Sequence, residues 1–221
     1  MSYDAALGQE VHKILLNKGI ETPINLKAKE SYPNKQELID VSIFNILTYL
    51  GMDLTDDSIS DTPKRVAKMF CHEVFEGLDY DKFPKCTAIE NKMGYDEIVC
   101  VRNIVIRSTC EHHLQPIYGK AHIAYIPGDK VLGLSKFSRV ADFFASRPQV
   151  QERLCEQIYA ALSYVLQTED VAVLIEAEHF CMKMRGVEDS CSDTVTSKMG
   201  GRFRSNQSAR EEVVALMTGG K

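Results

Sequence analysis

The 221-residue sequence lacks the features that would place it in a membrane or on nucleic acid. No apolar run approaches the ~18 residues that a membrane span requires, and the chain opens on an amphipathic stretch instead of a signal peptide. With 26 basic and 31 acidic side chains, a net charge of −5, it has no basic excess for coating nucleic acid. We therefore expect a cytoplasmic protein that binds neither a membrane nor nucleic acid. An anionic ligand would have to be held by a local cluster of basic residues.

Several nucleotide and zinc signatures are missing too. No Gly-x-x-x-x-Gly-Lys loop occurs, which excludes a P-loop. No Cys-x-x-Cys pair occurs, which argues against a closed Cys₄ zinc site. The His-x-Glu and Pro-Cys-x-x-Cys patterns of zinc nucleobase deaminases are absent. The seven cysteines are an odd number without an export signal, so some of them can be metal ligands or nucleophiles in a reducing compartment.

The first third of the chain has helical spacing of apolar residues. It predicts helices over 4–18, 35–50 and 62–76, the last with Thr62 as N-cap and Pro63 at its first position. Residues 24–35 are mostly polar and predict a linker. The second helix has an expected buried stripe that consists of Leu38, Ile39, Ile43, Ile46, Leu47 and Leu50.

The rest of the chain has a mixed pattern. Strands are predicted at 96–109, 117–125, 171–182 and 194–203. Helices are predicted at 136–146 with Ser135 as cap, at 148–166 from Pro148, and at 206–217. Strands and helices segregate more than they alternate, which favours an α+β fold with an antiparallel sheet.

Cysteine and histidine gather at two places, and these are the side chains that zinc prefers. The sequence Cys-Glu-His-His at 110–113 ends one predicted strand, and alternation along another would put His179 and Cys181 on one face. Two such groups on neighbouring strands can share one metal and leave a position open for water. Such a site needs three protein ligands, and the sequence offers six candidates: Cys110, His112, His113, His179, Cys181 and Cys191.

The alternative is that these cysteines are buried as small apolar residues and that the histidines fill space. Adjacent histidines diverge in an extended backbone, so either His112 or His113 could bind metal while the other faces a substrate as general acid or base.

Basic pairs form a second constellation. Arg65 with Lys68 and Lys136 with Arg139 are spaced i, i+3 on predicted helices, and Lys183 and Arg185 follow the His-x-Cys group. Any one pair is commonly a solvated surface, but together they indicate a polyphosphate or carboxylate site.

A carboxylate near a predicted helix start has two interpretations. Glu152 either stabilises the helix end or accepts paired hydrogen bonds from the N–H and amino group of a purine or pterin.

Several stretches resemble GTP cyclohydrolase I. They are TPKRVAKM at 62–69, STCEHH at 108–113, IP at 126–127, GLSK at 133–136, RPQVQERL at 147–154 and HFCMKMRG at 179–186. The resemblance covers roughly residues 35–215, so we divide the chain into an N-terminal helix and linker at 1–34 and a catalytic domain at 35–221.

The resemblance implies the tunnelling fold, an antiparallel sheet with helices on one side, here with a helical N-terminal extension. It implies Zn²⁺-dependent conversion of GTP to 7,8-dihydroneopterin triphosphate and formate, in a homodecamer of two pentamers. The family's zinc ligands fall on Cys110, His113 and Cys181, and its proton-transfer histidines on His112 and His179.

The family's substrate contacts also fall on residues of this sequence. Glu152 matches the guanine anchor, with Gln151 beside it. The triphosphate contacts fall on Ser135, Lys136, Arg139 and Arg185, with Arg65 and Lys68 supplied by a neighbouring subunit. Two alternatives stay open: a zinc-stabilised module that binds nucleotide without turnover, and a relative that stops at the formamide or diaminopyrimidine.

Overall fold

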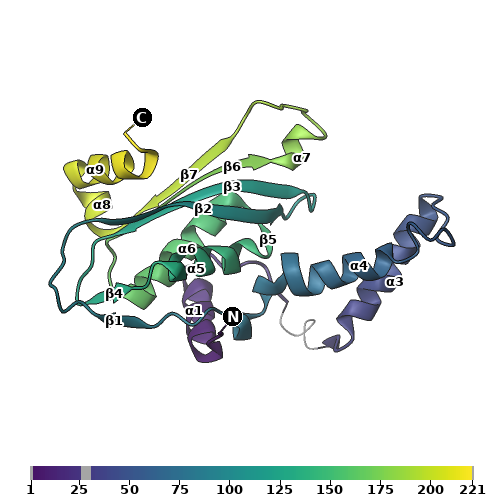
Figure 1. Ribbon diagram of the computed structural model, residues 1–221, viewed down its shortest axis with the longest axis horizontal. Coiled ribbons are helices and arrows are strands. Elements are labelled where there is room, and N and C mark those ends of the chain that lie inside the picture. Colours follow the sequence, from purple (N-terminus) through teal and green to yellow (C-terminus); the bar gives the residue numbers. More distant parts are fainter. Residues whose placement is uncertain (1, 26–30, 221) are drawn as a thin grey trace.

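The computed structural model describes residues 2–25 and 31–220, and it is built around a five-stranded sheet (Figure 1). The strand order is β5-β2-β3-β6-β7. The antiparallel strands are β2 (Val99–Cys110), β3 (Pro116–Tyr125), β6 (Val171–His179) and β7 (Thr194–Met199). At the edge, β5 (Pro148–Gln149) pairs in parallel with the end of β2, and β1 (Ala88–Glu90) pairs separately with β4 (Lys130–Leu132). The predicted α+β class and antiparallel sheet are confirmed.

Two helices cover one face of the sheet, and these are α5 (Ser135–Ala145) and α6 (Gln151–Leu166). Alternation along β3 turns Ile117, Ala121 and Ile123 toward them, and each is at most 1% exposed. Helix α1 (Ala5–Lys18) adds Val11 and Leu15 to the same core. Burial of these apolar faces is the main favourable contribution to this layer packing.

The opposite face of the sheet is covered at one end only. There α8 (Gly201–Ser205) and α9 (Gln207–Thr218) form a second core (Figure 1). Its buried residues are Ala124, Ile126, Ala172, Leu174, Met199, Phe203, Val213 and Met217. Toward the other end, Tyr118 and Lys120 on the same face are exposed. Strand β3 is therefore buried along the face that packs on α5 and α6, and its other face is covered only at the end near α8 and α9.

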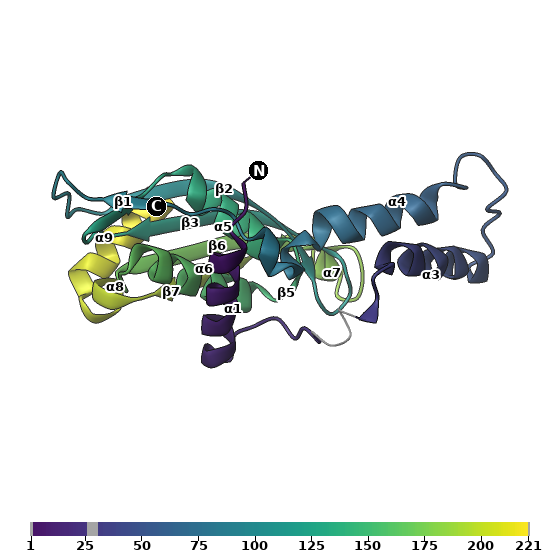
Figure 2. The ribbon, with the colours of Figure 1, turned by 90° about the horizontal axis from the view of Figure 1, so that it is seen from below.

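A helical arm, residues 31–69, extends from this body (Figures 1 and 2). It contains α3 (Lys35–Tyr49) and α4 (Thr62–Met69), and the chain continues into a π-helical turn, η1 (Phe70–Val74). Helix α3 has no buried residue, and Ile46 and Leu50 are 52% and 72% exposed. The predicted buried stripe of α3 is therefore wrong for the single chain. The periodicity marks a face suited to burial, but within this chain α4 is its main neighbour.

Helix α4 begins at Thr62 with Pro63 in its first turn, as predicted, but its N-cap is Asp61 and not Thr62. The predicted cap of α5 is also wrong, because Leu134 is the N-cap and Ser135 is the first helical residue. Pro148 belongs to edge strand β5, and α6 begins at Gln151. Cap-type residues also occur in first turns, and a proline, which lacks an N–H, fits an edge strand as well as a helix start.

Buried Arg147 ties the N-terminal segment to the sheet. Its guanidinium is fully buried, with Nη1 3.3 Å from Glu21 Oε1 and 3.1 Å from Tyr80 Oη. Nη2 donates to the carbonyl of Gly77, and the guanidinium also lies over the ring of Phe143. Since Glu21 follows α1, this ion pair anchors the start of the chain 126 residues away in sequence.

The boundary drawn at residue 34 stays a prediction, and residues 26–30 of the predicted linker lie outside the described residues. Among the helices of the described residues, none is long and apolar enough to cross a membrane.

Candidate metal centre and active site

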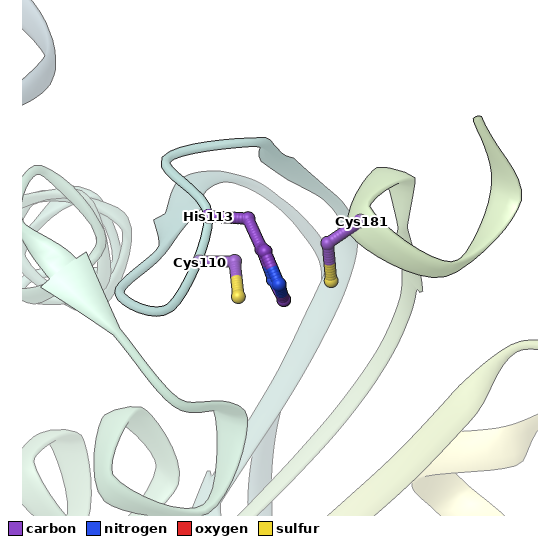
Figure 3. A group of neighbouring side chains, drawn as sticks. All are labelled: Cys110, His113 and Cys181. Carbon is purple, nitrogen blue, oxygen red and sulfur yellow. The ribbon is translucent and has the colours of Figure 1, made fainter. Parts of the chain in front are cut away.

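Cys110, His113 and Cys181 converge on one point (Figure 3). One ligand atom from each lies within 4.8 Å of the other two. Cys110 is the buried last residue of β2, His113 lies in the turn that follows, and Cys181 belongs to the short helix α7 (Phe180–Lys183). Three elements thus supply two sulfurs and an imidazole to one place.

A tight turn after β2 sets the positions of the two histidines. Leu114 N–H donates to the carbonyl of Cys110 at 2.9 Å, and Cys110 N–H donates to the carbonyl of Gln115 at 2.8 Å. His112 and His113 therefore lie in a turn and not in the expected extended backbone. Their rings lie edge to face, with centroids 6.4 Å apart and an angle of 72° between planes, and the His112 side chain is 64% exposed.

Cys181 reaches the cluster from a helical turn. Strand β6 ends at His179, so the prediction that His179 and Cys181 share a strand face is wrong. A helical turn in place of a strand changes which way Cys181 points, and it directs the thiol toward Cys110. Burial, with the neighbouring Cys110 thiol, raises the pKa of Cys181.

The cluster fits zinc. Bonds of about 2.0–2.3 Å in a tetrahedron separate ligand atoms by roughly 3.3–3.8 Å, so only a small contraction from the observed spacing is needed. The donor set of two thiols and one imidazole suits a borderline-soft cation. His112, His179 and Cys191 are not part of the cluster.

His179 lies at the end of β6 beside the start of α6. Its Nε2 is 2.8 Å from Gln151 Oε1. Burial lowers the pKa of His179, and the charge of Glu152 opposes that shift. Glu152 itself is exposed in the first turn of α6, while Gln151 is buried. The start of α6 thus presents an exposed carboxylate near a half-buried histidine.

An ion pair that the sequence alone did not indicate joins α6 to the turn at residues 111–113, called the metal turn below. Glu111 accepts from Arg153 Nη1 at 2.5 Å and from Nη2 at 3.2 Å, with both side chains about one-fifth exposed. The Arg153 hydrogen bond holds the pKa of Glu111 below its usual range. Glu111 and Arg153 are each adjacent in sequence to a predicted site residue, and this was the signal that could have identified them. The sequence did not show that they pair, because they are 42 positions apart.

The predicted triphosphate residues are not gathered in one place. Ser135, Lys136 and Arg139 lie in the first turns of α5. The metal end of the sheet adjoins the opposite end of that helix, where the Ala145 carbonyl accepts from Ser108 Oγ at 2.7 Å. An 11-residue helix is about 16 Å long. Within one chain, the basic residues at the start of α5 are therefore distant from the metal cluster.

The remaining basic candidates also lie apart from one another. Arg65 and Lys68 are exposed on the helical arm, where Arg65 pairs with Asp61 at 3.3 Å. Arg185 is exposed just after α7, and its positive charge partly offsets the rise in the pKa of the Cys181 thiol. Lys183 pairs with Glu178 at 2.9 Å. The chain therefore brings Arg185 to the metal cluster but not Arg65 or Lys68.

A cavity of about 730 Å³ separates the helical arm from the metal turn. Lys35 and Ile39 line it from the arm, and Glu111, His112 and Leu114 line it from the turn. The arm therefore forms one wall of a space that reaches His112.

Comparisons with known proteins agree on one family. Residues 39–218 match the sequence model of the family described as GTP cyclohydrolase I. The chain is 53% identical over 210 residues to GTP cyclohydrolase 1 of Shewanella denitrificans, covering 95% of each chain. It is 51% identical over 212 residues to GTP cyclohydrolase 1 of Erwinia tasmaniensis, covering 94% of this chain and 96% of that one. It is also 51% identical over 202 residues to the Yersinia pseudotuberculosis protein of that name, covering 91% of each.

Proposed function

The chain belongs to the GTP cyclohydrolase I family, and we propose that it hydrolyses GTP and rearranges it to 7,8-dihydroneopterin triphosphate and formate, the first step of tetrahydrofolate and pterin biosynthesis. The observation that carries this proposal is the convergence of Cys110, His113 and Cys181, with His112 in the same turn and His179 two residues before Cys181. The sheet with α5 and α6 on one face supports the tunnelling fold with a helical N-terminal extension.

Cys110, His113 and Cys181 would hold the zinc ion. A site with three protein ligands would leave a fourth position for solvent. Zinc in such a site supplies Lewis-acid chemistry and lowers the pKa of a coordinated water toward neutrality. The buried Cys110 at the end of β2 fixes one ligand to the sheet, so the site is anchored to a rigid element.

The histidines and Glu152 act on the substrate. Glu152 accepts hydrogen bonds from guanine N1–H and the 2-amino group, which orients the base. His112, exposed in the turn beside His113, donates a proton to N7 and so makes C8 electrophilic. His179 exchanges a proton at the ribose ring oxygen when the sugar opens. Holding these groups in register converts several separate steps into one bound sequence.

The triphosphate requires more than one chain. Ser135, Lys136, Arg139 and Arg185 contact it, with Arg65 and Lys68 from a further subunit. Support comes from the separation of Lys136 from the metal cluster and from the uncovered face of α3. We therefore infer a homo-oligomer with sites completed between subunits. The family resemblance implies that this oligomer is a decamer of two pentamers.

Incubation with GTP tests the proposal. Zinc-loaded protein should release formate and a product that gives neopterin fluorescence after oxidation, and Cys181→Ser should lose both along with bound zinc. Formate without neopterin would indicate a relative that stops at the diaminopyrimidine. GTP binding with neither product, together with unfolding on chelation, would favour the zinc-stabilised module, because an open catalytic zinc can be removed without loss of the fold.

A further inference from the structure

The side chain of Gln151 is 1% exposed, and its hydrogen bonds go to the protein. Nε2 donates to the carbonyl of Ile175 at 3.0 Å and to the carbonyl of Thr194 at 2.9 Å, with Thr196 Oγ1 3.2 Å away. These partners belong to β6 and β7, so the sheet holds the first residue of α6 in place. Both amide hydrogens are used by these acceptors.

The acceptors determine which way the amide faces. A backbone carbonyl oxygen can only accept, so the NH₂ group must point at Ile175 and Thr194. Rotation of the amide by half a turn would place Oε1 against two carbonyl oxygens, which cannot donate, and would leave both carbonyls without this donor. The orientation of Gln151 therefore follows from the partners around it.

That orientation in turn determines the protonation of the neighbouring imidazole. Gln151 Oε1 lies 2.8 Å from His179 Nε2, and an amide oxygen cannot donate. Nε2 must therefore carry the hydrogen. In a neutral imidazole the other nitrogen then has the lone pair, so Nδ1 is the acceptor.

We propose that Gln151 is a positioning residue that fixes the ring orientation of His179 and keeps the hydrogen of Nε2 directed at its own amide oxygen. Nδ1 is then the ring nitrogen left for contact with substrate, and this last clause rests on the proposed function. The assignment of Gln151 as a substrate-binding residue stays a prediction, and its amide hydrogens are already used by β6 and β7.

The tautomer is measurable without substrate. Nitrogen NMR of the histidine-labelled, zinc-loaded protein, with the His179 signal assigned by its loss in His179→Asn, should show a protonated Nε2 and a bare Nδ1. Hydrogen on Nδ1 in place of Nε2, or two averaged nitrogens, would overturn the proposal. If Nε2 carries the hydrogen as proposed and GTP is not turned over, the proposed function fails while the role of Gln151 stands.

A pair of variants separates positioning from packing. Gln151→Met has a similar length and no polar group, so the two His179 nitrogens should become averaged and kcat should fall about 10- to 100-fold with KM nearly unchanged. Gln157→Met is the control. Gln157 is also buried on α6 and donates to the carbonyl of Ile20 at 2.8 Å, so its loss should affect stability and leave the His179 spectrum unchanged.

An unchanged His179 spectrum in Gln151→Met would contradict the proposal. A raised KM with unchanged kcat would do so as well, because it would indicate a substrate contact. If Gln151→Met does not fold, the spectrum of the unmodified protein still decides.

Discussion

His122 lies in the middle of β3, on the face that α8 and α9 cover only in part. It is 5% exposed, and its nearest acid is Glu176, at 4.0 Å. Burial lowers the pKa of His122, Glu176 opposes the shift, and Arg102 and Lys120 reinforce it. The folded protein therefore favours the neutral imidazole at this position.

His122 should make stability depend on pH. The folded-state pKa is below the unfolded value of about 6.5, so the unfolded chain binds more protons below that pH. The free energy of unfolding is unaffected by His122 above pH 6.5 and decreases as the pH falls below it. In urea unfolding from pH 5 to 7.5, His122→Gln should show a shallower decrease than the unmodified protein. Parallel curves would show that His122 does not contribute.

Glu152 is predicted to distinguish guanine from adenine. A carboxylate accepts from both N1–H and the 2-amino group, whereas an amide offers one acceptor and a clashing NH₂ group. Glu152→Gln should lower kcat/KM for GTP by about 5- to 150-fold, which corresponds to roughly 1–3 kcal/mol. Zinc content and folding should not change, because Glu152 is exposed at the start of α6.

The control for Glu152 is one helical turn away. Glu156 pairs with Lys198 at 2.7 Å, and Glu156→Gln should turn over GTP normally. Normal turnover by Glu152→Gln would return Glu152 to the role of a charge that stabilises the helix end.

At the scale of elements, Glu111 and Arg153 join the metal turn to α6. Removal of either charge should loosen the turn and accelerate loss of zinc to a chelator, with a coupling energy of roughly 0.5–3 kcal/mol in a double-mutant cycle. The exchanged pair, Glu111→Arg with Arg153→Glu, should recover part of the loss. Lys198→Met serves as the control, because it breaks an α6 ion pair away from the turn.

Additive effects in that cycle would mean that the two side chains are neighbours without energetic coupling.

Sequence periodicity predicted most elements because it reflects local backbone geometry and burial. It located α3 but did not show what packs against its apolar face, because that face does not specify which chain will bury it. It placed His179 and Cys181 on one strand, because a four-residue helix such as α7 leaves no periodic signal.

The candidate site was predicted unevenly for a related reason. Cys110, His113 and Cys181 were all among the six candidates that the residues gave, and the resemblance selected these three. The partners of Gln151 lie 24 and 43 residues away, so the amide network could not be seen in the sequence. Such long-range pairings depend on sheet register, which composition and spacing do not specify.

For the whole molecule, the proposed oligomer can be tested by mixing. Arg65→Ala and His112→Ala should each be inactive alone, because each removes a different part of a site proposed to be shared between chains. Mixed and allowed to exchange subunits, they should recover part of the activity, because some hybrid sites are intact. No recovery after verified exchange would indicate sites built within one chain.

The Glu21–Arg147 ion pair connects the start of the chain to the residue before β5. Glu21→Gln leaves a buried guanidinium uncompensated, so we expect a loss of about 3–5 kcal/mol in the free energy of unfolding, measured in urea. The matched change is Glu10→Gln on α1, whose partner Lys13 is exposed, and it should cost almost nothing. Equal effects of the two changes would rule out a special role for Glu21.

The same ion pair has a consequence for the order of events during synthesis. Glu21 leaves the ribosome 126 residues before Arg147, so the segment after α1 must wait for most of the chain before this ion pair can form. The hairpin of α3 and α4 depends on neighbours in sequence and can form early, whereas closure of the core over α1 comes late. A newly made chain therefore lacks this buried ion pair until the last third is being translated.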